Sequence, residues 1–195
     1  MLDRPHLAAL LDGIALETER LRIRRFRPDD APVIRRQEAD PALMRFICDL
    51  RSPAEVDAKI EALQRTWGAA EGEWLGLPFE LRKARGMIGM VGTRVVSEKY
   101  ATLEMGWTIE PALWRRGLTG EACRALVDLL FDRGTARKII AYCVAENVAS
   151  SRLMEHLGMK REGCLRQHST LGEVWHDELV YGLFAAERPW QHPGR

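Results

Sequence analysis

The sequence predicts a single α/β (α+β) domain built on a mixed, mostly antiparallel twisted sheet of six to seven strands, with helices on both faces. Segments 75–81, 87–96 and 103–109 alternate apolar with polar or small residues, as strands do. Strand 103–109, an amphipathic helix at 120–133 and strand 138–144 then follow in order. This is the βαβ pattern of two parallel strands with a right-handed crossover, and flanking hairpins make the sheet mixed.

Composition and charge exclude several classes of protein. A chain of 195 residues, 46% hydrophobic and 29% charged, has the size and mix of one ordinary globular domain. Its formal net charge of +1 gives no indication of nucleic acid or a membrane surface as a partner. No apolar run approaches about 18 residues and the start of the chain lacks a secretory signal, so we expect neither a membrane span nor export.

The four cysteines are scattered, without a Cys-x-x-Cys pair or short Cys/His spacing. We therefore expect no disulfide framework and no metal site, and reduced thiols without an export signal predict a cytoplasmic protein. Cys143 lies in an apolar strand and is interpreted as a core residue; an acyl-cysteine intermediate is the alternative. His176 could line a substrate mouth.

The first half of the chain begins with a predicted extension at 1–15 that contains a short helix. Leu21 and Ile23 alternate with arginines and indicate the first strand. A helix follows 28–30, and a second opens at Ser52, where Pro53 and Glu55 complete a capping-box pattern.

The later elements follow from apolar spacing and helix-end signals. Pro78 inside strand 75–81 indicates an edge strand or a bulge. Helix 120–133 repeats apolar residues at i, i+3, i+4 and i+7 and ends in an arginine and a glycine. Asn147 opens a short helix. Two final strands span 159–167 and 174–184, and residues 188–195 are predicted to be a loose tail.

The loop before helix 120–133 carries the chemical signal. Gly117 and Gly120 let the backbone approach a ligand, and Arg115 and Arg116 add positive charge. Because the N-terminus of a helix presents unpaired N–H groups, this loop could hold a pyrophosphate. An ordinary strand-to-helix loop is the alternative. The Walker and dinucleotide fingerprints are both absent.

Residues 114–122 resemble the acetyl-CoA motif of the GNAT superfamily, Gln/Arg-x-x-Gly-x-Gly/Ala. Gly117 takes the central glycine, whereas Trp114 and Thr119 depart from the pattern at its first and last places. A cradle of backbone amides needs only N–H groups, so these departures leave it intact. We expect Glu121 to point outward, since an inward carboxylate would repel a phosphate. The resemblance implies a cofactor loop made of Arg115, Arg116, Gly117, Leu118, Thr119 and Gly120.

The resemblance extends to the Rim-type branch of GNAT enzymes, the ribosomal-protein N-terminal acetyltransferases and their relatives. Five segments match that branch in order: residues 16–21, 103–107, 147–150 with 157–159, 162–163 and 175–177. They cover residues 16–187, which we take as the domain. The branch implies an acetyl-CoA-dependent N-acetyltransferase without a metal.

In this family the pantetheine arm of the coenzyme lies between two parallel strands that splay apart. The resemblance places that splay between the fourth and fifth strands, 103–109 and 138–144. Backbone groups of Trp107, Thr108 and Ile109 are then expected to hold the arm; ordinary sheet hydrogen bonding is the alternative.

Glu104 is the candidate general base, because it shares a strand face with Gly106 and Thr108 near the predicted splay. A salt-bridged strand residue is the alternative. Asn147 and Ser150 are expected near the thiol end of the coenzyme, with Asn147 also serving as a helix cap. Many GNAT enzymes place a tyrosine where this chain has Met154, which cannot donate a proton. Ser150, a water or no dedicated acid would then serve the leaving thiolate.

Three functions remain open at this stage. The first is direct acetyl transfer to a primary amine, which is either a protein N-terminus or a small molecule, by a monomer or homodimer. A non-catalytic acyl-CoA-binding module is the second. The third is a nucleotide-binding α/β domain.

Overall fold

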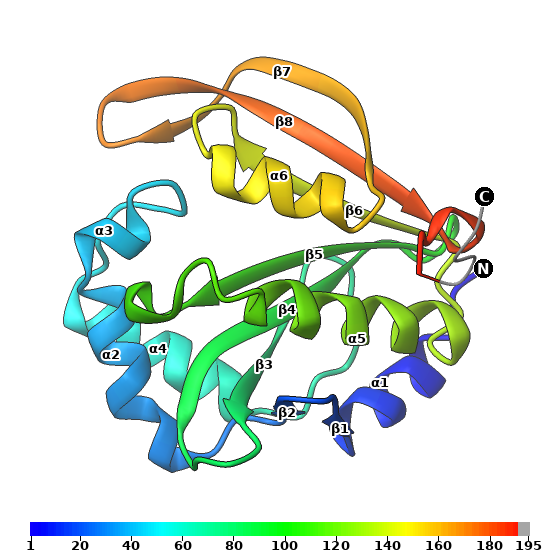
Figure 1. Ribbon diagram of the computed structural model, residues 1–195, viewed down its shortest axis with the longest axis horizontal. Helices are drawn as coiled ribbons and strands as arrows, with labels where there is room; N and C mark the ends of the chain where they lie inside the picture. Colours follow the sequence, from blue (N-terminus) through cyan, green and yellow to red (C-terminus); the bar gives the residue numbers. More distant parts are fainter. Residues whose placement is uncertain (191–195) are drawn as a thin grey trace.

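A single sheet of eight strands organises the computed structural model, which describes residues 1–190 (Figure 1). The strands run in the order β1-β2-β3-β4-β5-β6-β8-β7. Within the described residues, β5 and β6 are the one parallel pair of neighbouring strands. The strands are β1 (Ala15–Glu17), β2 (Leu21–Arg24), β3 (Trp74–Leu81), β4 (Met87–Ser97), β5 (Thr102–Ile109), β6 (Lys138–Val144), β7 (Lys160–Leu171) and β8 (Val174–Phe184).

Helices cover both faces of this sheet, as predicted. They are α1 (Arg4–Asp12), α2 (Ala31–Glu38), α3 (Pro41–Met44), α4 (Pro53–Gln64), α5 (Leu118–Asp132) and α6 (Val148–His156). The main core joins one face of the sheet to α1, α5 and α6, and it includes the fully buried Leu7, Leu103 and Leu126. A smaller cluster around Ile34 and Ile60 packs α2 and α4 against the other face.

The strand count exceeds the predicted six to seven because β1 was missed. β1 has three residues, too few to show an alternating pattern, and it pairs with β2 from Ala15↔Arg24 to Glu17↔Arg22. The predicted extension at 1–15 contains α1, whose Leu7 and Leu11 are fully buried in the main core.

Pro78 lies in β3, between two other strands, yet its surroundings fit the expectation of an edge or a bulge. β2 pairs with β3 only from Phe79 onward, so Pro78 has no β2 residue opposite it. The register with β4 shifts between Phe79 and Glu80. Because no β2 residue lies opposite Pro78, the N–H that proline lacks costs the β2–β3 pair no hydrogen bond.

The end of the chain differs from the predicted loose tail. Arg188 is buried and lies 2.7 Å from both Asp128 and Asp132 of α5. Trp190 Nε1 also donates to Asp128. These contacts tie residues 188–190 to the domain, and residues 191–195 lie outside the described part of the chain.

The parallel strands separate soon after they meet. β5 and β6 pair from Thr102↔Lys138 to Glu104↔Ile140, but β5 continues to Ile109 and β6 to Val144. The predicted splay is confirmed, and Glu104 stands at the last paired position before the strands diverge.

Candidate functional site

The first turn of α5 leaves its backbone N–H groups available. Gly117 is the N-cap in the left-handed conformation (φ 72°), and its position carries no side-chain cap. The amides of Leu118, Thr119 and Gly120 therefore have no partner from the helix itself. Arg115 and Arg116 are exposed beside this turn, and Leu118 is buried beneath it. The loop has the free donors and the positive charge that a phosphate group requires.

Gly120 also faces α6. A Cβ added at this position would lie 3.4 Å from Cδ1 of Leu153 on α6. This separation is an ordinary van der Waals contact, so α5 and α6 pack against each other at Gly120, beside the gap between β5 and β6 (Figure 1).

The Glu121 side chain points toward Thr18 and Arg20 rather than outward to the solvent. Its carboxylate accepts hydrogen bonds from Thr18 Oγ1 (2.5 Å), the Arg20 amide (2.8 Å) and Arg20 Nε (2.5 Å). Burial raises the pKa of Glu121, but these bonds more than offset it, so the pKa lies below its ordinary value. The negative charge is thus neutralised at the β1–β2 turn instead of facing the amides of the first turn.

The hydrogen-bond pattern of β5 decides which backbone groups face the splay. The Glu110 amide donates to the Ile88 carbonyl (2.9 Å), in register with the pair Met90↔Thr108. Because bonded pairs alternate in antiparallel strands, Thr108 bonds toward β4. Trp107 and Ile109 point their N–H and C=O groups toward the gap. Thr108 therefore leaves the predicted set of backbone donors.

One of these outward groups already has a partner. The Ile109 carbonyl accepts a hydrogen bond from Trp114 Nε1 at 3.1 Å. Trp114, which departs from the family motif, thus ties the loop before α5 to the end of β5.

The start of α6 is fixed by Asn147. Its side-chain oxygen accepts from the Ser150 amide at 3.1 Å, which makes Asn147 the N-cap as expected. Ser150 is half-buried, and Met154 is fully buried in the main core. Asn147 and Ser150 both lie near the end of β6 that diverges from β5, because Asn147 follows Val144 by three residues.

Glu104 is buried and paired with an arginine on the neighbouring strand. Arg94 Nε donates to Glu104 Oε2 at 2.8 Å, and Arg94 Nη2 lies 2.6 Å from the same oxygen. Burial raises the pKa of Glu104 above its ordinary value; Arg94 opposes this shift and Glu178 adds to it. Both arginine contacts fall on Oε2, which leaves Oε1 for another partner.

A cavity of ≈ 350 Å³ opens beside Glu104. Its lining draws on strands far apart in the sequence: Gly72, Arg94, Val95, Val96, Glu104, Tyr142, His168 and Glu178. Sequence reasoning missed Arg94, Tyr142, His168 and Glu178. Strand alternation within β6 could have found Tyr142, which shares a face with Ile140, the partner of Glu104. Glu178 joins this face only through the pairing of β6 with β8.

Three glycines stand in a row across the sheet on this same face. Gly76 pairs with Gly92, and Gly92 pairs with Gly106. Trp74 lies over the row, since a Cβ at Gly92 or Gly106 would meet its ring at 3.5 Å or 3.4 Å. Arg94 stacks on that ring with its Cζ 5.1 Å from the centroid. Leu63 and Met90 lie over Gly76, so the indole covers the two glycines on β4 and β5, beside Glu104.

Comparison with known proteins identifies the family of the domain. Residues 20–160 match the family model described as an acetyltransferase (GNAT) domain. The chain belongs to the GNAT acetyltransferase family. It is an acyltransferase of that family, and the α5 loop and the splayed strands are the elements that the family resemblance predicted.

Relatives of this GNAT enzyme match along most of its length. The uncharacterized N-acetyltransferase YnaD of Bacillus subtilis is 31% identical over 175 residues, which cover 88% of this chain and 98% of the relative. A GNAT-family acetyltransferase from Bacillus anthracis has a TM-score of 0.77 at 25% identity, covering 89% of this chain and 100% of that one. The ribosomal L7/L12 acetyltransferase RimL, solved with coenzyme A, shares the fold with a TM-score of 0.74 at 16% identity, covering 88% and 98%.

Other reactive side chains of this GNAT domain carry no second site of the predicted kinds. Cys143 is buried, and burial raises its pKa to about 11, which disfavours the thiolate that an acyl-cysteine would need. His176 Nδ1 lies 3.3 Å from Glu146, on the sheet face that carries Glu178. No group of three potential metal ligands occurs among residues 1–190, and no helix there is long and apolar enough to cross a membrane.

Proposed function

We propose that this GNAT enzyme transfers an acetyl group from acetyl-CoA directly to a primary amine that enters the cavity beside Glu104. One observation carries the proposal: a buried carboxylate with one free oxygen stands where β5 and β6 part. A reacting amine in the cavity would meet that oxygen from one side of the sheet. The coenzyme arm would approach through the gap from the side of α5 and α6.

The residues that would hold acetyl-CoA follow from the free backbone groups. The amides of Leu118, Thr119 and Gly120, with the charges of Arg115 and Arg116, suit the diphosphate. The outward N–H groups of Trp107 and Ile109 suit the amide groups of the pantetheine arm. The acetyl-CoA thioester supplies the activated acyl group.

Glu104 would act as the general base. Acceptor amines are mostly protonated at neutral pH, and an ammonium ion cannot attack a carbonyl carbon. Glu104 Oε1 would accept the proton directly or through one water, and the raised pKa of Glu104 brings it nearer the working pH. Arg94 holds the carboxylate in place through the other oxygen.

The leaving thiolate needs little help from this chain. Met154 has no proton to give, and a free thiol ionises with a pKa of about 8.5, so the coenzyme can depart as the thiolate or take a proton from water. Ser150 carries the half-buried hydroxyl at the start of α6 and would lie near the departing sulfur.

The acceptor is the least constrained partner. The E. coli ribosomal-protein-serine acetyltransferase is 24% identical over 103 residues, covering 53% of this chain and 58% of that relative. This similarity and the Rim-type sequence segments together support a place in the Rim-type branch. A protein N-terminus is therefore one class of acceptor to be tested. A small primary amine is the other arm, because the cavity volume suits a compact group.

Release of free thiol from acetyl-CoA tests the proposal. The purified chain is mixed with acetyl-CoA and a panel of peptides with free N-termini, amino-acid amides, polyamines and aminoglycosides. We expect turnover with at least one amine and intersecting initial-rate lines when both substrates vary. Parallel lines would contradict direct transfer. Acetyl-CoA binding without turnover would indicate a binding module, and a melting temperature raised by ATP or NAD instead would indicate a nucleotide-binding domain.

A further inference from the structure

The loop before α5 has a strained backbone. Arg115 takes a left-handed conformation (φ 60°) although it is not a glycine, and Gly117 lies in the same region (φ 72°) two residues later. A residue with a side chain keeps such angles only where the surrounding structure enforces them. The contacts made to this loop from outside therefore decide where the amides at the start of α5 point.

Arg20, in the turn between β1 and β2, makes such a contact. Its Nη1 atom donates to the Arg116 carbonyl at 3.0 Å. Its Nε atom donates to the Glu121 carboxylate at 2.5 Å. The guanidinium thus bridges the residue before Gly117 and the first turn of α5, which lie 96 and 101 positions further along the chain.

The Arg116 carbonyl is the group that could otherwise occupy an amide of the first turn. In an α-helix the N–H of residue i donates to the carbonyl of residue i−4, so the Gly120 amide would take the Arg116 carbonyl if the helix extended backward. The first bond of this kind in α5 instead runs from the Glu121 amide to the Gly117 carbonyl, at 3.1 Å. Because the Arg116 carbonyl is turned toward Arg20, the Gly120 amide stays available to a ligand.

The same contact fixes the direction of the Gly117 amide. Among the described residues every peptide bond is trans, and in a planar trans peptide the C=O and N–H groups point in opposite directions. Since the Arg116 carbonyl points toward Arg20, the Gly117 N–H points away from it. A Cβ added at Gly117 would lie 3.5 Å from Arg20 Nη2, so the guanidinium lies directly against the backbone here.

We propose that Arg20 is a positioning residue for the coenzyme, because it keeps the Gly117 and Gly120 amides free to bind the diphosphate of acetyl-CoA. The inference rests on the function proposed for this loop. Arg20 acts through the backbone of the loop and not through contact with the coenzyme. Arginine suits this role, since its planar guanidinium bonds two partners in fixed directions, whereas a lysine ammonium is a flexible point charge.

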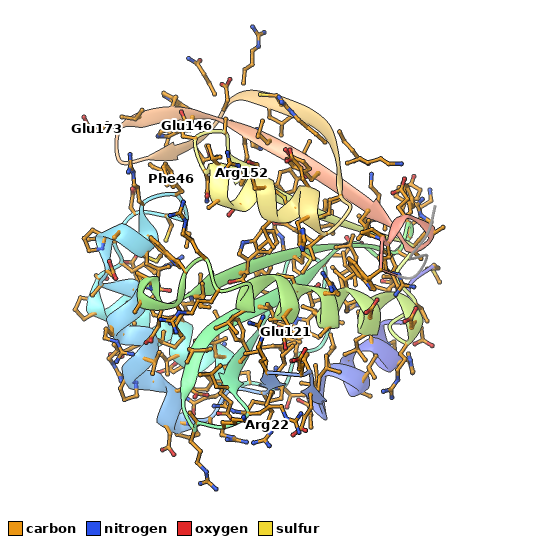
Figure 2. All side chains as sticks on the ribbon, in the orientation of Figure 1. Arg22, Phe46, Glu121, Glu146, Arg152 and Glu173 are labelled. Carbon is orange, nitrogen blue, oxygen red and sulfur yellow. The ribbon has the colours of Figure 1, made fainter. Side chains whose placement is uncertain are left out.

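Coenzyme affinity tests the role of Arg20. In Arg20→Gln the Kd for CoA, measured by calorimetry, is expected to rise by about tenfold, roughly the effect of one hydrogen bond. Arg20→Lys keeps the charge without the two-pronged geometry and should lose a similar amount. Two matched controls should keep the affinity of the unaltered protein. Arg22→Gln removes a β2 arginine that pairs with Glu17 (Figure 2), and Glu121→Gln leaves the bond from Arg20 to the Arg116 carbonyl in place.

A shortened donor separates positioning from a general loss of stability. S-acetylpantetheine carries the thioester and the pantetheine arm but no diphosphate. Arg20→Gln should therefore lower kcat/KM for acetyl-CoA by about tenfold and leave kcat/KM for S-acetylpantetheine unchanged.

Several results would overturn the inference while leaving the proposed function in place. These are an unchanged Kd for CoA in Arg20→Gln, full affinity in Arg20→Lys, and an equal fall in kcat/KM with both donors. Absence of CoA binding by the unaltered protein would instead remove the proposed function itself. If the unaltered protein binds CoA but releases no thiol, catalysis fails and the comparison of Kd values still decides the role of Arg20.

Discussion

The first turn of α5 and the cavity beside Glu104 handle charge in different ways. At the first turn, backbone amides and a left-handed glycine form the site, and the acidic neighbour Glu121 is neutralised by Arg20. In the cavity, side chains from five strands form the site, and the carboxylate of Glu104 is kept buried with a raised pKa.

The difference explains which sequence changes each site tolerates. Every residue except proline supplies a backbone N–H, so Trp114 and Thr119 can depart from the family motif as long as the backbone keeps its shape. A side-chain site depends on the identity of each residue. We therefore expect changes at Glu104 to affect catalysis most, and changes in the loop to matter only where they alter backbone geometry.

The largest effect is expected from Glu104→Gln. The amide cannot accept the acceptor's proton, so kcat/KM should fall by about 10²- to 10⁴-fold, the usual contribution of a positioned base. Thiol release measures the rate, and acetyl-CoA binding should stay unchanged. Glu173→Gln, at the exposed tip of the β7–β8 hairpin (Figure 2), is the control and should keep full activity.

The pH dependence of the same reaction sharpens this prediction. A base works in its deprotonated form, so the rate should fall as pH drops through the pKa of Glu104. Because that pKa is raised, the fall should begin above the ordinary range of a glutamate. Glu104→Gln should lack this acidic limb. If the acidic limb persists unchanged in the variant, a group other than Glu104 causes it.

Gly117→Val tests the backbone site. Valine at a φ of 72° is strained by about 1–3 kcal/mol, and relieving the strain turns the first-turn amides away. We expect the Kd for acetyl-CoA to rise by about ten- to a hundredfold, measured by calorimetry. Gly172→Val carries a similar strain (φ 60°) at the hairpin tip. It should lower stability and leave the Kd for acetyl-CoA unchanged. An equal loss of affinity in both variants would contradict the proposal that the loop before α5 binds the coenzyme.

Glu121→Gln should affect stability rather than binding. The lowered pKa of Glu121 means that its charged form stabilises the fold above its ordinary value of 4.5, and that this gain is lost as pH falls through the folded pKa. At pH 7 the variant should lose about 1.5–3 kcal/mol of unfolding free energy, as for hydrogen bonds to a charged group. Denaturant melts at pH 7 and in strong acid should show the difference shrinking in acid. A difference independent of pH would contradict this account.

The smallest effect is expected from Trp114→Phe. The change removes one hydrogen bond to the Ile109 carbonyl from a side chain that is 47% exposed. One such bond contributes about 0.5–1.5 kcal/mol, so the Kd for acetyl-CoA should rise less than about tenfold. A loss of acetyl-CoA affinity as large as that of Gly117→Val would show that a side chain, not the backbone, determines binding by the loop.

Much of the fold could be predicted because its signals are local. The Ser52 and Glu55 side chains form the predicted capping box at the start of α4, and helix 120–133 closely matches α5. The βαβ order placed the parallel pair correctly, and the family resemblance placed its splay. Short or irregular elements escaped: β1 has only three residues, and β7 extends to Leu171, past the predicted end at 167.

Most residues of the cavity beside Glu104 could not be predicted from the sequence, because the cavity depends on pairings between strands that are distant in the chain. Glu104 could be chosen from strand alternation, whereas its partner Arg94 and the facing Glu178 depend on strand order across the sheet. His168 reaches the cavity through a bulge, and a bulge breaks the alternation on which the prediction depends. The contacts of Glu121 were equally hidden, since Thr18 and Arg20 are about 100 residues away in the chain.

The aligned glycines beneath Trp74 have a practical consequence for altering selectivity. No other side chain rises from that part of the sheet, so the indole alone fills the space over Gly92 and Gly106. Shortening this one residue should open space over Gly92 and Gly106, next to the cavity that is proposed to receive the amine. Bulkier amines could then be admitted through a single substitution, which makes Trp74 the natural starting position for engineering this enzyme.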